Sequence, residues 1–294
     1  MKKVACGVVV LSVVACLLLW MLWEEPVAFE DKMLRRAVTR SLGKPVLRAG
    51  VLYRMRSSLG LTFGTRLKLK EYFPKPSEMG KMSAVRSRGM RRIERLGGLE
   101  HAPNLTTLEL SRQRISDISL LAVLANLSQL ELSHNQIEDI SVLAELPNIM
   151  RLDLGHNSIS DVSVVRRLGQ LERLNLNFNN VSAIEPVSKS AKLEVLRFYG
   201  NQVSDVSAVS ALKNLKTLEA GKNEISDVSA LSGLVNLVEL GLSRNQINDV
   251  SALAGLRGLE YLNLEGNALN REAYEVYLPR IIANNPGMRL IVDQ

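Results

Sequence analysis

Cysteine, histidine and aromatic residues are scarce in this sequence. Of its 294 residues, only two are cysteines and three are histidines, and aromatic side chains make up 4%. Both cysteines, Cys6 and Cys16, lie in an apolar run at the N-terminus, so the rest of the chain has neither a disulfide nor a thiolate metal site. The sequence also lacks a nucleophile with a base at a recognisable spacing and a glycine-rich phosphate loop. We therefore expect no catalytic activity and no cofactor.

The apolar run itself contains no charge. It covers residues 4–23, follows two lysines and has tryptophans near its end. A helix of this length spans the hydrocarbon core of a bilayer, and tryptophan favours the interface. The pattern predicts a transmembrane anchor or signal-like segment over 1–23, with residues 24–294 in the periplasm or outside the cell. Two alternatives are a cleaved secretion signal and a lipoprotein in which "VVAC" makes Cys16 the modified residue.

Positive charge is concentrated just after this run. Residues 24–98 contain 18 Lys/Arg against 7 Asp/Glu, a net charge of +11, whereas residues 99–294 contain 17 against 23, a net charge of −6. We expect 24–92 to form a basic N-terminal cap and linker. The basic segment 32–95 can contact anionic lipid or an anionic envelope polymer. The alternative is a solvated surface without a ligand, and no nucleic acid partner is expected.

Most of the chain repeats with a period of 22 residues. Leucine-type residues recur at this period from Leu105 to Leu259, and further apolar columns begin at Leu108 and Leu110. A spacing of two puts Leu108 and Leu110 on one face of a strand, and stacked units bury that face jointly. The period predicts a solenoid of repeats over 93–270.

Two polar columns account for the bends between strands. An asparagine follows each strand, where its amide can pair backbone groups that would otherwise cost roughly 1–3 kcal/mol each if buried alone. This structural ladder is Asn135, Asn157, Asn179, Asn201, Asn223, Asn245 and Asn267. An Asp-x-Ser step comes next and can cap a short convex helical turn. In the fourth unit Ala183 replaces the aspartate and Ser190 replaces a leucine, which predicts a local bulge or, alternatively, a bend or contact point.

These columns resemble the leucine-rich repeat family, specifically the 22-residue internalin-like subclass of bacteria. The pattern L-x-x-L-x-L-x-x-N-x-I-x-D-[IV]-S-x-L is met in nearly every unit. Residues 27–45, with Asp31 as a helix cap, resemble the family's N-terminal helical cap, and 271–294 resemble its closing helix and strand. The resemblance implies an α/β, right-handed solenoid with a parallel concave sheet and short convex helical turns. It also implies protein–protein recognition at a bacterial surface or in the periplasm.

The variable positions of the concave strand face are the candidates for binding. Adjacent strands lie about 4.8 Å apart, so units three to five bring arginines and aromatic residues to one surface. Such residues are over-represented at binding hot spots, and we expect a protein partner there. The predicted partner-binding residues are Arg151, Arg173, Asn175, Phe178, Arg197 and Tyr199.

Two other groups on this face have simpler interpretations. His134 and His156 are stacked neighbours, but two imidazoles without another ligand form a weak zinc site. Glu109, Glu131 and Asp153 form an acidic row that can meet a basic partner or calcium, although we expect a solvated row of charges.

The function that these features favour is a non-catalytic protein-binding module displayed from a bacterial membrane. One alternative is a structural or envelope-associated spacer held through the basic N-terminal segment. Another is a cytoplasmic regulatory scaffold with the reverse membrane topology.

Overall fold

The structure, a computed structural model, describes residues 28–42, 76–87 and 93–293. The predicted membrane segment, residues 4–23, therefore lies outside the described residues, as does most of the basic linker. Within the described ranges, no helix combines the length and the apolar character that crossing a bilayer requires.

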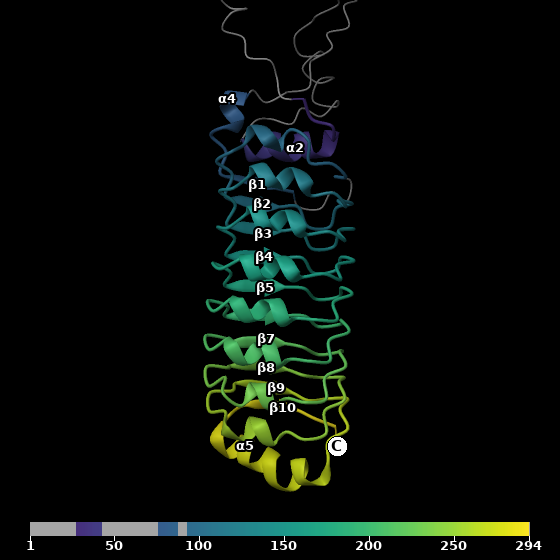
Figure 1. The fold of residues 1–294 in the computed structure, drawn as a ribbon, viewed down its shortest axis with the longest axis vertical. Helices are drawn as coiled ribbons and strands as arrows, with labels where there is room; N and C mark the ends of the chain where they lie inside the picture. The colour runs from purple at the N-terminus through teal and green to yellow at the C-terminus, as the bar shows by residue number, and fades with distance from the viewer. Residues whose placement is uncertain (1–27, 43–75, 88–92, 294) are drawn as a thin grey trace, which may run out of the picture.

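Ten short strands form one parallel sheet in which every strand pairs with its neighbours in sequence, as expected (Figure 1). From β2 to β9 the paired residues are 22 apart, as in Thr107 with Gln129 and Arg151 with Arg173. The sequence period is therefore the register of the sheet. The strands are β1 Ala84–Arg86, β2 Thr107–Glu109, β3 Gln129–Glu131, β4 Arg151–Asp153, β5 Arg173–Asn175, β6 Val195–Arg197, β7 Thr217–Glu219, β8 Glu239–Gly241, β9 Tyr261–Asn263 and β10 Arg289–Ile291.

A short 3-10 turn lies opposite each repeat's strand and confirms the expected convex helical turns. Each turn from the second onward starts at the position that the serine of the Asp-x-Ser step occupies. In the fourth unit this position holds a glutamate. The turns are η1 Leu99–His101, η2 Ser119–Val123, η3 Ser141–Glu145, η4 Ser163–Arg167, η5 Glu185–Lys189, η6 Ser207–Ala211, η7 Ser229–Leu231 and η8 Ser251–Gly255.

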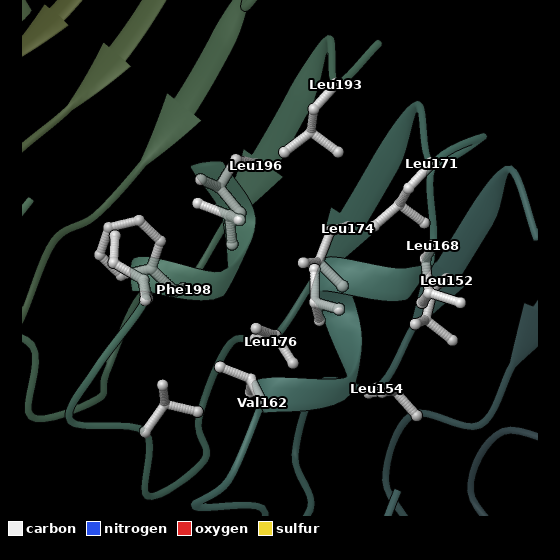
Figure 2. Close-up of a cluster of buried hydrophobic side chains, with 14 of the residues drawn as sticks. Leu152, Leu154, Val162, Leu168, Leu171, Leu174, Leu176, Leu193, Leu196 and Phe198 are labelled. Carbon is white, nitrogen blue, oxygen red and sulfur yellow. The ribbon is translucent and has the colours of Figure 1, made fainter. Parts of the chain in front are cut away.

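The core lies between the sheet and these turns and continues through every unit. Figure 2 shows Leu152 and Leu154 of one unit beside Leu174 and Leu176 of the next. All four side chains are buried. Phe198 takes a leucine position in the following unit and is fully buried as well. Each unit thus buries its apolar face against its neighbours, which is how a solenoid is stabilised.

A helical cap covers the first strand and confirms the expected N-terminal helix. Helix α2, Lys32–Ser41, packs against β1, and the side chain of Asp31 accepts the amides of Met33 at 2.6 Å and Leu34 at 3.1 Å. The other carboxylate oxygen of Asp31 accepts the amide of Glu94 at 2.7 Å, so the cap residue also joins the helix to the first repeat. A single helical turn, α4 Pro76–Met79, precedes β1.

The opposite end of the stack is closed by a second helical segment (Figure 1). A π turn, η9 Ala273–Tyr277, leads into helix α5, Leu278–Asn284, and then to β10 at the edge of the sheet. The buried amide of Asn285 fastens this segment to the last unit. Its Oδ1 accepts the amides of Gly258 at 2.7 Å and Leu259 at 2.9 Å.

Candidate functional site

The asparagine ladder joins the bend after each strand to the preceding unit. The side-chain oxygen of Asn179 accepts the amide of Ile159 in the preceding unit at 3.0 Å. Its nitrogen donates to the carbonyls of Leu154 and Leu176, each at 3.0 Å. The same three bonds recur at every ladder position from Asn135 to Asn267. Backbone groups inside the bends are thereby paired, and the sheet becomes a regular platform.

The Asp-x-Ser steps stabilise the convex turns. In each of the six steps the carboxylate accepts the serine amide two residues on, as Asp139 does from Ser141 at 2.8 Å. These bonds lower the pKa of the carboxyl groups of Asp117, Asp139 and Asp205, because an amide that points at a carboxylate stabilises its ionised form.

The fourth unit lacks this cap and departs from the pattern in its side chains. Its turn, Glu185–Lys189, is five residues long, as is Ser163–Arg167 in the preceding unit, so the expected bulge is not present. Glu185 begins the turn in place of a capped serine, and Pro186 follows it. The side chain of Ser190 is only 1% exposed, and its hydroxyl has no hydrogen-bond partner among the described residues.

A column of residues in the left-handed backbone region borders the strand face. Its non-glycine members have φ between 53° and 61°, and they are Arg112, His134, His156, Phe178, Lys222 and Arg244. Gly200 and Gly266, with φ of 70° and 73°, occupy the same place in their units. The repeat pattern did not predict this backbone conformation, although the two glycines in the column were a signal of it.

Rings from this column and from Tyr199 form a row. We call His134, His156, Phe178 and Tyr199 the aromatic stack. The ring centroids of His134 and His156 are 3.9 Å apart, and those of His156 and Phe178 are 4.4 Å apart. Tyr199 continues the row at 5.3 Å from Phe178, with the two rings inclined at 58°. Gly200 makes room for Phe178, since a Cβ on that glycine would lie 2.9 Å from the ring. Phe178 remains 40% exposed, so the stack presents an aromatic surface to solvent.

The predicted arginines line a hollow on the strand face. This arginine hollow, with a volume of about 250 Å³, is bordered by Arg151, Arg173 and Arg197, together with Glu131 and Asp153. Arg151 and Arg173 are exposed and occupy the same register position on β4 and β5. Within the described part of the chain, none of the three arginines forms an ion pair.

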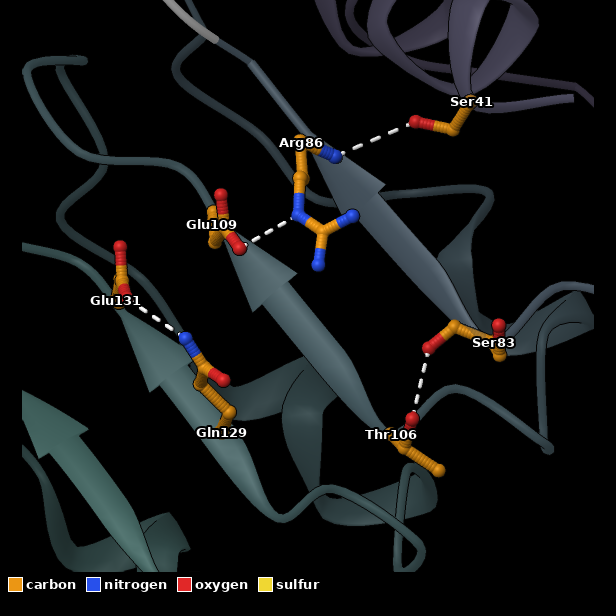
Figure 3. Close-up of polar contacts among 7 residues, drawn as sticks. All are labelled: Ser41, Ser83, Arg86, Thr106, Glu109, Gln129 and Glu131. Carbon is orange, nitrogen blue, oxygen red and sulfur yellow. Dashed lines mark hydrogen bonds and ion pairs between the residues drawn. The ribbon is translucent and has the colours of Figure 1, made fainter. Parts of the chain in front are cut away.

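The acidic residues around the arginine hollow have other partners. Glu131 accepts the side-chain amide of Gln129 at 2.8 Å, as Figure 3 shows at the N-terminal end of the sheet. Asp153 accepts the Asn175 side chain at 2.8 Å and the backbone amide of Gly155 at 3.0 Å. Asn175 therefore holds a neighbour in place through one of the two N–H donors of its side-chain amide.

Two further acidic residues, Glu109 on β2 and Glu219 on β7, lie on the strands that flank the hollow. Glu109 accepts Arg86 Nε at 2.6 Å, so the acidic row begins with an ion pair (Figure 3). On the other side, burial raises the pKa of the Glu219 carboxyl, and the positive charge of Arg197 partly opposes that rise. Among the described residues, no group of three or more His, Cys, Asp or Glu side chains is arranged to hold a metal ion.

The structure places the six predicted binding residues on one face but in two groups. The arginine hollow lies over the strands, whereas the aromatic stack lies beyond their ends. Arg173 and Phe178 are five residues apart, which corresponds to about 16 Å in extended chain. Arg197 and Tyr199, two residues apart on the same face, connect the two groups.

Comparisons with known proteins agree with this architecture. Sequence profiles described as leucine-rich repeats match residues 103–145, 145–165 and 226–269. The structure of internalin C2 from Listeria monocytogenes is 31% identical in sequence, covers 79% of this chain and 92% of its own, and superposes with a TM-score of 0.66. Internalin F from the same organism shares the fold at 23% identity, covering 87% and 84% with a TM-score of 0.51.

A leucine-rich repeat structure from a plant is also similar to this chain. The leucine-rich repeat ectodomain of a membrane receptor kinase from Arabidopsis thaliana, solved in complex with Casparian strip integrity factor 2, is 25% identical with a TM-score of 0.59. It aligns with 64% of this chain, which corresponds to 24% of the ectodomain. No significant match occurs among curated proteins.

Proposed function

This chain belongs to the leucine-rich repeat family, in the internalin-like group, and on that basis we propose that it is a non-catalytic module that binds a protein through its concave face. The observation that carries the proposal is the surface of units three to five. There the arginine hollow, whose arginines form no ion pair with a described residue, lies next to an exposed aromatic stack. Arginine and aromatic side chains are the residues that dominate protein–protein hot spots.

The separate roles of buried and outward-facing side chains within each unit support the same proposal. Side chains that build the solenoid are buried or bonded to the backbone, as Leu174 and Asn179 are. Side chains at alternate strand positions, such as Arg173, face outward from a rigid sheet. A rigid platform loses little conformational entropy on binding, which favours affinity.

Residues 4–23 support a further proposal about display. We propose that they anchor the protein in a bacterial membrane, with residues 24–294 in the periplasm or outside the cell. Adding a protease to intact cells and to spheroplasts tests this. Removal of residues 24–294 by external protease is expected, and their full protection in spheroplasts would place them in the cytoplasm instead.

The binding proposal is tested by cross-linked capture with the detergent-solubilised full chain. The test variant combines Arg151→Glu, Arg173→Glu, Phe178→Ala and Tyr199→Ala. A matched control carries Arg167→Glu, Arg257→Glu, Val123→Ala and Val235→Ala, which change two exposed arginines and two exposed valines away from the sheet. Circular dichroism verifies that both variants are folded.

We expect one protein to be captured by the wild type and the control variant and lost with the test variant. Equal capture by all three would move binding to the basic segment 32–95 and would favour an envelope-associated spacer. Loss with the control variant alone would place the binding surface on the convex side.

A further inference from the structure

We propose that the arginine hollow binds two carboxylates of an extended acidic segment in the partner protein, an inference that rests on the proposed function and specifies its ligand. The segment carries an acidic residue, a spacer, a second acidic residue, a second spacer and then an apolar residue. The apolar side chain packs on the aromatic stack.

The spacing of the arginines sets the spacing of the acids. Arg151 and Arg173 are register partners on adjacent strands, so their backbones are about 4.8 Å apart and one carboxylate can lie between their side chains. Arg197 is one strand further and two residues along from the Arg173 position. The strand spacing and the rise per residue put its Cα about 8 Å from that of Arg173. Alternate side chains of an extended peptide are about 7 Å apart, so one carboxylate can meet Arg173, with Arg151 beside it, while the next acidic side chain meets Arg197.

The hollow carries more positive than negative charge, because three arginines and two carboxylates border it, and a carboxylate from outside complements that excess. The two acidic residues that border it accept hydrogen bonds from neutral amides, Glu131 from Gln129 and Asp153 from Asn175. Like charges gathered on a surface repel one another, and an incoming carboxylate relieves that repulsion. Guanidinium groups pair with carboxylates in a bidentate, charge-assisted geometry.

The size of the hollow suits the carboxylate groups of side chains. Its volume of about 250 Å³ is smaller than that of small-molecule pockets, which span roughly 300–1,000 Å³. Val195 lines it between the arginines and is nearly buried, so the hollow has an apolar wall beside the charges.

The aromatic stack supplies the third contact. Tyr199 lies two residues beyond Arg197 on the same face, so a segment that passes from Arg173 over Arg197 next reaches Tyr199 and Phe178. The two rings are 5.3 Å apart, and Phe178 is exposed. An apolar side chain at the fifth position of the segment is therefore placed over these rings.

Fluorescence polarisation with the full chain tests this inference. The probe is a peptide of order Ser-Glu-Ser-Glu-Ser-Leu-Ser with an uncharged dye, and the matched probe has Gln in place of both Glu residues. Binding is measured for the wild type, for Arg173→Gln and for Arg167→Gln, which alters an exposed arginine on a convex turn. We expect the Gln peptide and the Arg173→Gln variant each to weaken binding about tenfold or more, and Arg167→Gln to change it less than about twofold.

Three results would overturn the inference. Equal binding of the Glu and Gln peptides would show that carboxylates are not selected. Equal weakening by Arg173→Gln and Arg167→Gln would show attraction to net charge alone. Competition by inorganic phosphate at the concentration of the peptide would show a site for a small anion. In each case, protein capture that still depends on Phe178 and Tyr199 would leave the proposed function intact, and capture indifferent to them would overturn that function as well.

Discussion

The bends after the strands and the strand face itself follow opposite rules within the same 22-residue unit. At the bends, seven asparagines make the same three hydrogen bonds in unit after unit, and their side chains face the backbone. On the strand face, a single register column changes from Gln129 to Arg151, Arg173 and Val195 in four successive units. Repetition therefore marks the residues that build the solenoid, and variation marks those available for recognition.

Asn179 at a bend and Asn175 on the strand face show the same difference, although both are asparagines. Asn179 is 7% exposed and bonds only to backbone groups. Asn175 is on the strand face, where it donates to Asp153 and accepts the amide of Asn177 at 3.0 Å. Its bonds hold side chains and a loop at the surface and do not join buried backbone groups of successive units.

The largest expected effect comes from removing a ladder asparagine. Asn179→Ala leaves two carbonyls and one amide without their side-chain partner, and buried groups of this kind cost roughly 1–3 kcal/mol each. We expect the free energy of unfolding, measured by urea denaturation, to fall by about 3 kcal/mol or more. Asn175→Ala is the matched control and is expected to cost less than about 1 kcal/mol. Similar losses in the two variants would contradict the division between bend and strand face.

An intermediate effect is expected where the fourth unit departs from the others. Ser190→Ala removes a buried hydroxyl that has no described partner, so the free energy of unfolding should rise by about 1 kcal/mol. Ser232→Ala, at an exposed site, should leave it unchanged within about 0.5 kcal/mol. A loss of stability in Ser190→Ala would contradict the interpretation that the buried hydroxyl is unpaired.

A comparable effect is expected from a convex cap, and it depends on pH. Asp139→Ala removes the bond to the Ser141 amide and should cost about 1 kcal/mol near neutral pH. The folded state lowers the pKa of Asp139 below its unfolded value, which is about 3.9. Its contribution is therefore complete above the unfolded pKa and is lost as pH falls through the folded pKa.

The measurement is urea denaturation of the wild type and Asp139→Ala at several pH values between about 7 and 2, a range that includes the reference pKa. The difference between the two proteins should shrink toward the acid end. A difference that stays constant, or grows, as the pH falls would show that the carboxylate form is not what stabilises the turn.

The smallest effect is expected from a glycine substitution in the left-handed column. Arg244→Gly places the permissive residue at φ 55°, and we expect a gain of about 0.5 kcal/mol, because relief of backbone strain exceeds the added freedom of the unfolded chain. Gly266→Ala, at φ 73°, should cost about 1 kcal/mol. Gly169→Ala is the control, since nothing lies within 4 Å of an added Cβ there. A larger loss at Gly169 than at Gly266 would contradict this reading of the column.

The fold was predictable from the sequence because its determinants recur at a constant interval. Leu108 and Leu110 indicated a strand, the period gave the register, and Asp31 was recognised as the cap of the first helix. The candidate site was predictable only in part. Spacing placed Arg173 and Phe178 on one face, but it did not show that they belong to separate groups. The bond from Asn175 to Asp153 depends on side-chain conformations, which periodicity does not determine.

The histidines illustrate the same limit. His134 and His156 were expected to be neighbours, yet their participation in one stack with Phe178 follows from the left-handed backbone at each position. Each of these three residues has a left-handed backbone, and successive rings lie against each other across the units. No single unit contains this information, because it arises only when the units are stacked.

Binding through the concave face is tested by site-specific photo-cross-linking in cells that produce the protein. A benzophenone-bearing phenylalanine is introduced at Phe178 on the concave side or, as the control, at Val235, which is 65% exposed away from the sheet. We predict that light yields a discrete protein adduct from position 178 and none from position 235. An adduct from position 235 with none from position 178 would contradict binding through the concave face.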